Sequence, residues 1–391
     1  MTAGVILTIN AGSSSIKFSI YDPGDEPEER LRGEVEDIGD SATLFIHSGN
    51  CGQRRVEIGH ADHTAALGAI LRHAGNGFGG RPVAGVGHRI VHGGTEYASP
   101  VRLDEETIDQ LATLEPLAPL HQPHNLAAVR AAHEAFPHAI QVACFDTAFH
   151  RSHPWVNDTF ALPREWYERG VRRYGFHGLS YEYVSGEVAR IAPELRHGRV
   201  VIAHLGNGAS MCAVRDGRSV ASTMGFTALD GLPMGTRCGQ LDPGVLLYML
   251  DHEKMTSDEI TDLLYRKSGL KGLSGMTNDM RELEASDRPE AADAIEYFVF
   301  RIRRELGALA AVLGGLDAFV FTGGIGENSA HVRRKVCEGM NWLGIEIDDE
   351  KNAGNALELG TGATRVLVVP TDEERVIARA VNAALNGGET P

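Results

Sequence analysis

The sequence predicts a two-domain α/β protein built by duplication of one architecture. Each half begins with an apolar run, a turn rich in glycine and small polar residues, and a returning apolar run, at residues 5–22 and 199–217. Aligning Gly12 with Gly208 superimposes the two segments at an offset close to half the chain, and similar elements follow in the same order. The 391 residues are enough for about two domains of ~150 residues each.

In the first half, apolar runs and alternation predict strands, and apolar residues at helical spacing predict helices. The expected strands are residues 5–11, 15–22, 42–49, 53–59, 83–91 and 139–146. The expected helices are residues 63–75 and 125–136, and Pro137 ends the second one. Residues 22–29 (DPGDEPEE) are predicted to form an exposed acidic loop.

The second half follows the same plan after its opening pair of strands. Helices are expected near residues 243–253 and 293–314, and a buried strand at 317–322 enters a glycine-rich turn. Residues 364–385 predict a last strand followed by a helix. Nothing in the pattern prevents this final helix from returning to the first domain.

Composition and charge restrict the class of protein. The formal net charge is −16 and no Lys- or Arg-rich run is visible, which argues against nucleic-acid or anionic-membrane partners. No uninterrupted apolar stretch reaches membrane-spanning length, and the N-terminus lacks the pattern of a signal peptide. The five cysteines are odd in number and form no C-x-x-C pair, which indicates reduced thiols. We therefore expect a cytoplasmic protein.

The first turn, within residues 8–18 (TINAGSSSIKF), is rich in groups that bind anions. Consecutive backbone N–H groups and hydroxyls can form an anion-binding nest, and Lys17 adds a positive charge. The amide oxygen of Asn10 could reach a metal ion or its water shell. Taken alone, the segment is better explained as a serine-rich hairpin, and its spacing is not that of a Walker loop.

Four other residues stand out by their context. Arg89 in GHRIVHGG lies at a predicted strand end beside glycines, where it suits an anion clamp. Asp146 follows an apolar strand, so it is either paired or functional, or it caps a turn or helix. Arg237 lies in a Gly/Pro loop, as positioned anion contacts often do. His177 in YGFHGLS is, by itself, more simply a packed turn histidine.

The remaining glycine-containing segments indicate a nucleotide-binding site. Residues 204–210 (HLGNGAS) repeat the pattern of the first turn and suggest a second phosphate nest. Residues 321–329 (FTGGIGENS) lie between a strand and a helix but lack the third glycine of a dinucleotide fingerprint. Asp279 and Arg281 could hold a ribose and a base, or could cap a helix. Glu373 could hold Mg²⁺ through water, or could complement a helix dipole. Together these turns favour a cleft for ATP and a small anion.

These segments resemble, in order, the signature segments of the acetate kinase family. They are NAGSSSIKF, GHRIVHGG, CFDTAFH, YGFHG, HLGNGAS, LPMGTRCG, FTGGIGENS and PTDEE, and they span nearly the whole chain. The family belongs to the acetate and sugar kinase/Hsp70/actin superfamily. The resemblance implies a duplicated two-domain actin-like fold, each domain with a mixed five-stranded sheet flanked by helices, and an active site in the interdomain cleft. It also implies an N-terminal domain of residues 1–147 with 376–391, and a C-terminal domain of residues 148–375 that carries the nucleotide site and the interface of a homodimer.

The resemblance assigns roles residue by residue. The implied catalytic residues are Arg89, Asp146, His177 and Arg237. The implied substrate-binding residues are Arg89, Val91, Leu120 and Phe176, the last three lining an apolar acyl pocket. The implied ATP-binding residues are Lys17, His204, Leu205, Gly206, Asn207, Gly208, Asp279, Met280, Arg281, Gly323, Gly324, Ile325, Gly326 and Glu327. The implied ligands of Mg²⁺, for which Mn²⁺ can substitute, are Asn10 and Glu373.

The implied reaction is the reversible transfer of the γ-phosphoryl group of ATP to acetate, which gives ADP and acetyl phosphate for acetyl-CoA biosynthesis. The family usually reads F-T-P-L-E-G before its L-P-M-G-T-R segment, whereas this chain reads FTALDG, with Ala228 and Asp230 at the changed positions. Alanine in place of proline could widen the acyl pocket slightly. Propionate or another short-chain acid therefore stays an alternative substrate.

The chemistry of the acceptor distinguishes the rival functions. A carboxylate is already ionised at pH 7, so no base is needed, and we expect Asp146 to orient an arginine or a metal-bound water. A sugar kinase would need such a base for its hydroxyl acceptor, and polar residues where Val91, Leu120 and Phe176 stand. A non-catalytic actin-like regulator would need an appended DNA-binding or polymer-contact segment, which we do not expect here.

Overall fold

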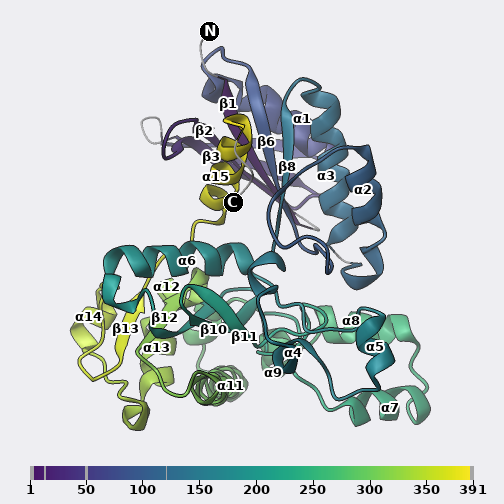
Figure 1. The fold of residues 1–391 in the computed structure, drawn as a ribbon. Helices are drawn as coiled ribbons and strands as arrows, with labels where there is room; N and C mark the ends of the chain where they lie inside the picture. The colour runs from purple at the N-terminus through teal and green to yellow at the C-terminus, as the bar shows by residue number, and fades with distance from the viewer. Residues whose placement is uncertain (1–3, 13–14, 49–51, 120, 388–391) are drawn as a thin grey trace. The chain divides into compact units, whose positions relative to one another are not determined.

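The computed structural model describes residues 4–12, 15–48, 52–119 and 121–387 (Figure 1). The chain forms two units. Unit 1 comprises residues 1–149 and 372–391, and unit 2 comprises residues 150–371. The Asp372 side chain caps the terminal helix, which begins at Glu373 and lies in unit 1.

Unit 1 is built on a mixed sheet in the strand order β5-β4-β3-β2-β1-β6-β8-β7. Its strands are β1 (Val5–Ala11), β2 (Ile16–Asp22), β3 (Glu28–Glu36), β4 (Ala42–Ser48), β5 (Gly52–Gly59), β6 (Val83–Ile90), β7 (Val101–Arg102) and β8 (Ile140–Phe145). Strands β1, β6 and β8 are parallel, and the strands from β1 through β2, β3 and β4 to β5 pair antiparallel.

Unit 2 is built on a five-stranded mixed sheet in the order β11-β10-β9-β12-β13. Its strands are β9 (Arg199–Leu205), β10 (Ala209–Arg215), β11 (Arg218–Ser222), β12 (Ala318–Thr322) and β13 (Arg365–Val368). Strands β9, β12 and β13 are parallel, and β10 is antiparallel to both β9 and β11.

The two sheets share one five-stranded pattern. The order and directions of β11-β10-β9-β12-β13 match those of β3-β2-β1-β6-β8. The predicted duplication is therefore confirmed, and so is the five-stranded mixed sheet of unit 2. In unit 1 the expected five strands are the middle of a sheet of eight, since the hairpin of β4 and β5 extends one edge and the short β7 extends the other.

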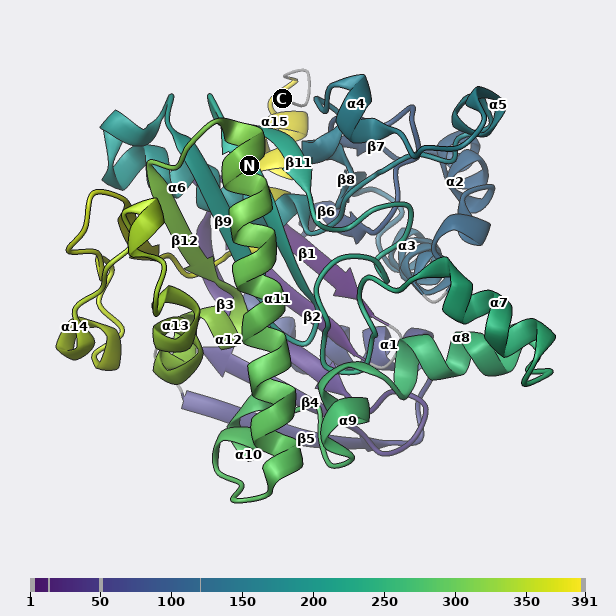
Figure 2. The same ribbon diagram turned by 90° about the horizontal axis from the view of Figure 1, so that it is seen from below.

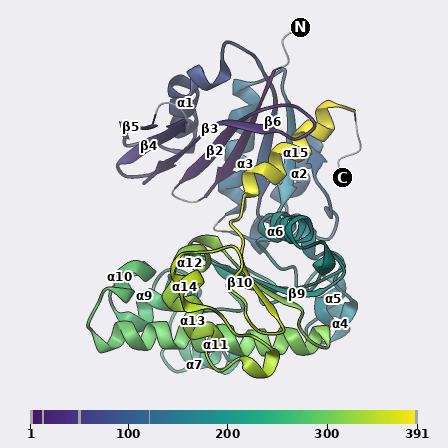
Figure 3. The ribbon, with the colours of Figure 1, turned by 90° about the vertical axis from the view of Figure 1, so that its left-hand side faces the viewer.

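The helices are distributed over both units. Those of unit 1 are α1 (His63–His73), α2 (Glu105–Ala112), α3 (Gln122–Ala135) and α15 (Glu373–Leu385). Those of unit 2 are α4 (Trp155–Asp158), α5 (Arg164–Glu168), α6 (Gly178–Ile191), α7 (Pro243–Asp251), α8 (Ser257–Arg266), α9 (Gly269–Ser274), α10 (Met280–Glu284), α11 (Pro289–Leu313), α12 (Gly323–Asn328), α13 (Ala330–Cys337) and α14 (Asp349–Ala353). Within unit 2, α11 runs along one face of the sheet (Figure 2), and α6 covers the opposite face (Figure 3).

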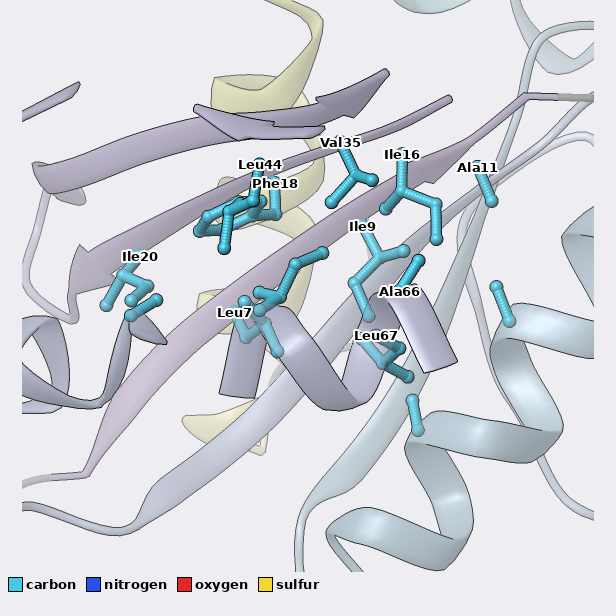
Figure 4. Packing of buried hydrophobic residues seen from close by; sticks show 14 of the residues in the cluster. Leu7, Ile9, Ala11, Ile16, Phe18, Ile20, Val35, Leu44, Ala66 and Leu67 are labelled. Carbon is cyan, nitrogen blue, oxygen red and sulfur yellow. The ribbon is translucent and has the colours of Figure 1, made fainter. Parts of the chain in front are cut away.

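The two faces of the unit 1 sheet follow from the alternation along β1 and β2. Leu7, Ile9 and Phe18 point to one face, where they pack with Ala66 and Leu67 of α1 (Figure 4). Burying such side chains stabilises the unit by roughly 1.5–3 kcal/mol for each large one.

Helix α15 packs on the other face of this sheet, over β1, β6 and β8. Its approach is close, because a Cβ atom added at Gly87 would lie 2.3 Å from Cγ2 of Ile377. The final helix of the chain therefore belongs to unit 1, and Oε2 of its first residue, Glu373, lies 3.2 Å from Nη1 of Arg89 in β6.

One predicted loop is wrong in part. Residues 28 and 29 of the expected acidic loop 22–29 begin strand β3, which the sequence pattern did not reveal. The strand is highly charged on one side, but Leu31 and Val35 alternate into the core at 8% and 0% exposure. Alternation of only a few apolar residues among glutamates and arginines is a weak strand signal.

The described residues bear on two expectations from composition, which concern membrane-spanning segments and disulfide bonds. Of the helices in this part of the chain, none has both the length and the apolar character that crossing a membrane requires. Four cysteines lie in it, namely Cys144, Cys212, Cys238 and Cys337, and none of these four is in a disulfide bond. This agrees with the predicted lack of a disulfide framework, and Cys51 lies outside the described residues.

Candidate active site

A cluster of polar side chains gathers at one edge of the unit 1 sheet. Asn10 lies near the end of β1, Arg89 near the end of β6, and Asp146 directly after β8. Because these strands are parallel and adjacent, their carboxyl ends meet at the same edge. Glu373, the first residue of α15, lies within ion-pair distance of Arg89 in this group. All four residues lie at or near the end of a strand or helix. The parallel strands bring Asn10, Arg89 and Asp146 together, and α15 adds Glu373.

Arg89 is the centre of this cluster. Its Nε and Nη2 atoms donate to Oδ1 and Oδ2 of Asp146 at 2.9 and 2.7 Å, which is a two-point pair. Its Nη1 atom lies 3.2 Å from Oε2 of Glu373 and donates to Oδ1 of Asn10 at 3.3 Å. The Asp146 side chain is 3% exposed and that of Arg89 is 20% exposed. Arg89 therefore has a fixed orientation while part of it remains accessible.

Burial and charge act in opposite directions in the cluster. Burial raises the pKa of Glu373, although Arg89 opposes this by stabilising the carboxylate. Burial likewise disfavours the charged form of Arg89, but attraction to Asp146 and Glu373 outweighs it and raises the pKa of the guanidinium. Arg89 is thus charged at every physiological pH, and it is the counter-charge that makes two nearby carboxylates tolerable.

The same cluster has the donor chemistry of a site for a hard cation. Asn10, Asp146 and Glu373 offer amide and carboxylate oxygens, which are the ligands that Mg²⁺ prefers. Within the described ranges, no group of three or more His, Cys, Asp or Glu side chains is arranged to hold a metal ion. The predicted ligands are Asn10 and Glu373, and Mg²⁺ commonly combines one or two such groups with non-protein ligands.

Lys17 stands beside this cluster on β2. It pairs directly with Asn10 across the β1–β2 ladder, and its side chain is exposed. Its charge opposes the rise in the pKa of Glu373 that burial causes. The serines at 13 and 14 lie outside the described residues.

The predicted acyl-pocket residues are only partly described. Val91 is buried at 8% exposure, and its backbone N–H donates to Asn125. Phe176, in unit 2, is buried at 2% exposure. Leu120 lies outside the described residues.

Unit 2 contains a cavity of about 670 Å³, which is a size suited to a nucleotide. It is lined by Gly206, Asn207, Asn278, Asp279, Met280, Arg281, Glu284, Gly324, Ile325, Asn328 and Ser329. Seven of these residues belong to the predicted ATP-binding set, and they lie in the turn at 206–207, at the start of α10 and on α12. Asn278, Glu284, Asn328 and Ser329 were not predicted, although Asn278 directly precedes the predicted Asp279, and Asn328 and Ser329 end the segment FTGGIGENS.

The glycine-rich segment that was expected to be a turn forms helix α12, and its other residues shape the backbone beside the cavity. Gly323 has a φ of +78°, and a Cβ atom there would lie 2.8 Å from the carbonyl oxygen of Leu205, so glycine is required. The Glu327 carboxylate accepts hydrogen bonds from the backbone N–H groups of Gly323 and Thr371, at 2.8 and 3.1 Å. Glu327 thus links the start of α12 to the backbone at Thr371 and does not line the cavity.

Asp279 has the helix-capping role that the sequence left open. Its carboxylate accepts from the backbone N–H of Arg281 at 2.9 Å and pairs with the Arg281 guanidinium. The hydrogen bonds from Arg281 hold the pKa of Asp279 below its ordinary value. Because both residues also line the cavity, capping of α10 and ligand contact are compatible.

His177 precedes α6 and has a left-handed backbone with a φ of 59°. Its Nδ1 atom lies 2.8 Å from Oγ of Ser210, and its ring stacks on that of His204 with centroids 4.4 Å apart. A Cβ atom at Gly208 would lie 3.0 Å from Nε2 of His177. His177 therefore lies directly against the 204–208 turn, and the structure joins two motifs that are separate in the sequence.

Arg237 lies in the loop between β11 and α7. Its Nη1 atom donates to the backbone oxygen of Ala228 at 3.0 Å. Asp230, the other residue that departs from the family pattern, accepts from Arg173 at 3.2 Å. The FTALDG segment is thus bonded directly to the predicted catalytic arginine.

Comparison with known proteins agrees with the predicted family and fold. The chain matches the model of the Acetokinase family over residues 5–379. It is 58% identical to an acetate kinase of Methylocella silvestris, covering 97% of this chain and 98% of that protein. A crystal structure of a propionate kinase from Francisella tularensis superposes with a TM-score of 0.91 at 34% identity, covering 96% and 98% of the two chains. That of Porphyromonas gingivalis acetate kinase gives 0.86 at 37% identity, with the same coverage. The chain therefore has the duplicated actin-like fold and belongs to the acetokinase family.

Proposed function

We propose that the protein is an acetate kinase, which reversibly transfers the γ-phosphoryl group of ATP to acetate and forms acetyl phosphate and ADP. The observation that carries the proposal is the two-point pair of Arg89 and Asp146 in a chain of this family. A guanidinium held by a buried carboxylate presents its remaining donors in a fixed direction, which suits a small anionic substrate.

The residues of each unit have distinct tasks in this proposal. In unit 1, Arg89 binds and orients the carboxylate substrate, and Asp146 orients Arg89. In unit 2, the cavity residues hold the nucleotide, while His177 and Arg237 donate hydrogen bonds to the γ-phosphoryl group. Phosphoryl transfer depends mainly on positioning and on cations near the equatorial oxygens of the phosphoryl group. Neither Asp146 nor Glu373 therefore has to act as a base. That transfer takes place in a cleft between the domains stays a prediction.

The oxygen donors of Asn10 and Glu373 fit Mg²⁺, or Mn²⁺ in its place, and we propose them as its ligands. When bound, the ion would neutralise charge on the nucleotide phosphates and template their orientation.

Propionate is the second candidate substrate, and Ala228 is the observation that favours it. The family usually has proline at this position, and the smaller alanine leaves more room for a longer acyl chain. The similarity to the F. tularensis propionate kinase is compatible with this alternative.

A homodimer in the cytoplasm completes the proposal. Helix α7 of unit 2 has no buried residue, and Leu247, Tyr248 and Leu250 are 59%, 52% and 43% exposed. Apolar exposure of this kind on one short helix suits contact with a second copy of the chain. Light scattering of the wild type and of Leu247→Glu tests it, since a monomeric wild type would contradict the dimer.

The activity is tested by trapping the product with hydroxylamine. ATP and Mg²⁺ are supplied with acetate, propionate and butyrate in parallel with glucose and fructose. We expect hydroxamate from the short acids, fastest with acetate. Phosphorylation of a sugar without hydroxamate would contradict the proposal.

A further inference from the structure

The environment of His177 contains a hydrogen-bonded series that the proposed mechanism does not yet use. Nδ1 of His177 lies 2.8 Å from Oγ of Ser210, and the Ser210 hydroxyl is also hydrogen-bonded to the phenol oxygen of Tyr181. Ser210 and Tyr181 are both 0% exposed, whereas His177 is half-buried. The series therefore leads from the interior of unit 2 to a ring that remains partly accessible.

The local structure explains why these three residues meet. His177 is the cap residue before α6 and Tyr181 lies in the first turn of that helix, where its backbone N–H donates to the carbonyl oxygen of His177 at 3.1 Å. Ser210 is the second residue of β10 and pairs with His204 across the β9–β10 ladder. The hydroxyl of Ser210 thus stands where α6 crosses the sheet, and the ring of His204 stacks on His177 from the same ladder position.

The series can hold its hydrogens in two arrangements, and one of them has the phenol of Tyr181 as the donor to Ser210. Burial raises the pKa of its phenol well above the ordinary value, so the group stays protonated and can donate. A hydroxyl has one hydrogen to give and can also accept. If Tyr181 donates to Ser210, then Ser210 can donate to Nδ1, and the hydrogen of the neutral imidazole stands on Nε2.

Nε2 is the atom that lies toward the glycine-rich turn. A Cβ atom at Gly208 would come within 3.0 Å of it, so any larger residue at 208 would crowd this edge of the ring. An N–H group here attracts phosphate oxygens, whereas a lone pair here would repel them. The tautomer of His177 therefore determines whether the ring helps or hinders an anion at the 204–208 turn.

We propose that Tyr181 and Ser210 are positioning residues that hold neutral His177 in its Nε2–H tautomer, so that this N–H donates to the phosphoryl group. The inference deepens the proposed function, since it rests on His177 contacting the transferring group. Neither Tyr181 nor Ser210 touches substrate in this account, and both act only through His177.

The tautomer is measured by ¹⁵N-edited NMR of the histidine side chains in the intact protein without nucleotide. The resonances of His177 are assigned by their loss in His177→Gln. We expect the Nε2–H pattern in the wild type and a mixture of tautomers in Ser210→Ala and Tyr181→Phe. Tyr174→Phe is the matched control, because it removes a buried phenol of unit 2 that donates to the backbone oxygen of Gly170 instead. The Nδ1–H pattern in the wild type would overturn the inference.

Kinetics provide the second readout. In Tyr181→Phe and Ser210→Ala, kcat is expected to fall about 10-fold to 100-fold with KM for both substrates little changed, because a positioned donor acts mainly in the transition state. Ser210→Thr keeps the hydroxyl and should restore the tautomer and most of kcat. Unchanged kcat and tautomer in Tyr181→Phe would overturn the inference. Absence of acyl phosphate formation in the wild type would instead refute the proposed function, and the NMR result would then stand by itself.

Discussion

Arg89 and Asp146 form a two-point ion pair at the ends of two adjacent parallel strands, with Nε–Oδ1 and Nη2–Oδ2 distances of 2.9 and 2.7 Å. A two-point pair fixes the plane of the guanidinium as well as its position. Asp146 thereby has a partner that explains its burial, and the arginine keeps Nη1 directed toward Asn10 and Glu373.

The first prediction concerns Asp146→Asn. An amide can accept only one of the two hydrogen bonds, so Arg89 loses its fixed plane, and kcat should fall by about 100-fold or more. The loss should persist at raised pH, since no base is removed. Chemical denaturation should show a free energy of unfolding lower by about 2 kcal/mol. Asp22→Asn, which alters a more exposed pair with Arg30, is the control. Recovery of activity at high pH would indicate that Asp146 is a base after all.

Arg237→Ala gives the second prediction. If Arg237 stabilises charge that develops on the phosphoryl group, the variant should lose kcat by about 100-fold to 1,000-fold while both KM values stay within a few fold. Arg173→Ala, which breaks the pair with Asp230, is the matched control in the neighbouring segment. A change in KM alone would show that Arg237 only binds the ground state.

Lys17→Ala gives the third prediction. Lys17 faces Asn10 on the ladder, and the equivalent position of the second half, Ala213, is a buried strand residue without charge. The variant should therefore raise KM for ATP by about tenfold, the loss of one phosphate contact worth about 1.4 kcal/mol. Arg32→Ala removes an exposed charge from the neighbouring strand β3 and serves as control. A rise in KM for acetate with KM for ATP unchanged would place Lys17 at the other substrate.

The fourth prediction tests the pocket residue Ala228. Restoring proline should narrow the acyl site, and one methylene in a pocket is worth about 10-fold to 200-fold in discrimination. Ala228→Pro should therefore shift the ratio of kcat/KM for acetate to that for propionate toward acetate. The backbone oxygen that Arg237 uses is retained, so activity with acetate should change little. A shift toward propionate would show that residue 228 does not limit the pocket.

The fifth prediction concerns stability in acid. Burial lowers the pKa of His150 to about 4, from an ordinary value of 6.5. The unfolded chain binds this proton as the pH falls below about 6.5, whereas the folded chain does not until about pH 4. Stability should therefore decrease from pH 6.5 toward pH 4, with a slope approaching about 1.4 kcal/mol per pH unit for this residue. Urea titrations of His150→Gln should show a flatter profile, with the exposed His197→Gln as control. Equal slopes in the wild type and His150→Gln would contradict the assignment.

Much of the fold was predictable because strand ends and glycine turns carry strong local signals. The offset between Gly12 and Gly208 predicted the duplication that the two matching sheets confirm. Strand β3 was not predicted because its apolar residues are separated by charged ones. Only the burial of these residues and the pairing with β2 identify the strand. The parallel order that brings Asn10, Arg89 and Asp146 to one edge is likewise a property of the whole sheet.

The positioning residues could not be found in the sequence for a different reason. Ser210 ends the segment HLGNGAS and Tyr181 follows His177 by four residues, but nothing in either segment indicates that both side chains bond in one series with His177. Their role depends on a hydroxyl lying at a helix–sheet crossing, which is a tertiary property. The cavity residue Glu284 could not be predicted for the same reason, because only the packing of α10 brings it beside Ser329 at the end of α12.

The central claim is that a carboxylate accepts the γ-phosphoryl group of ATP on this protein. Phosphorus-31 NMR of the wild type with ATP, Mg²⁺ and acetate tests it most directly, because acyl phosphate, inorganic phosphate and sugar phosphates have separate resonances. We expect acetyl phosphate and ADP to appear in equal amounts, and ATP to form again when acetyl phosphate and ADP are supplied. Formation of ADP with inorganic phosphate alone, in the presence of acetate and without hydrolysis of added acetyl phosphate, would contradict the account.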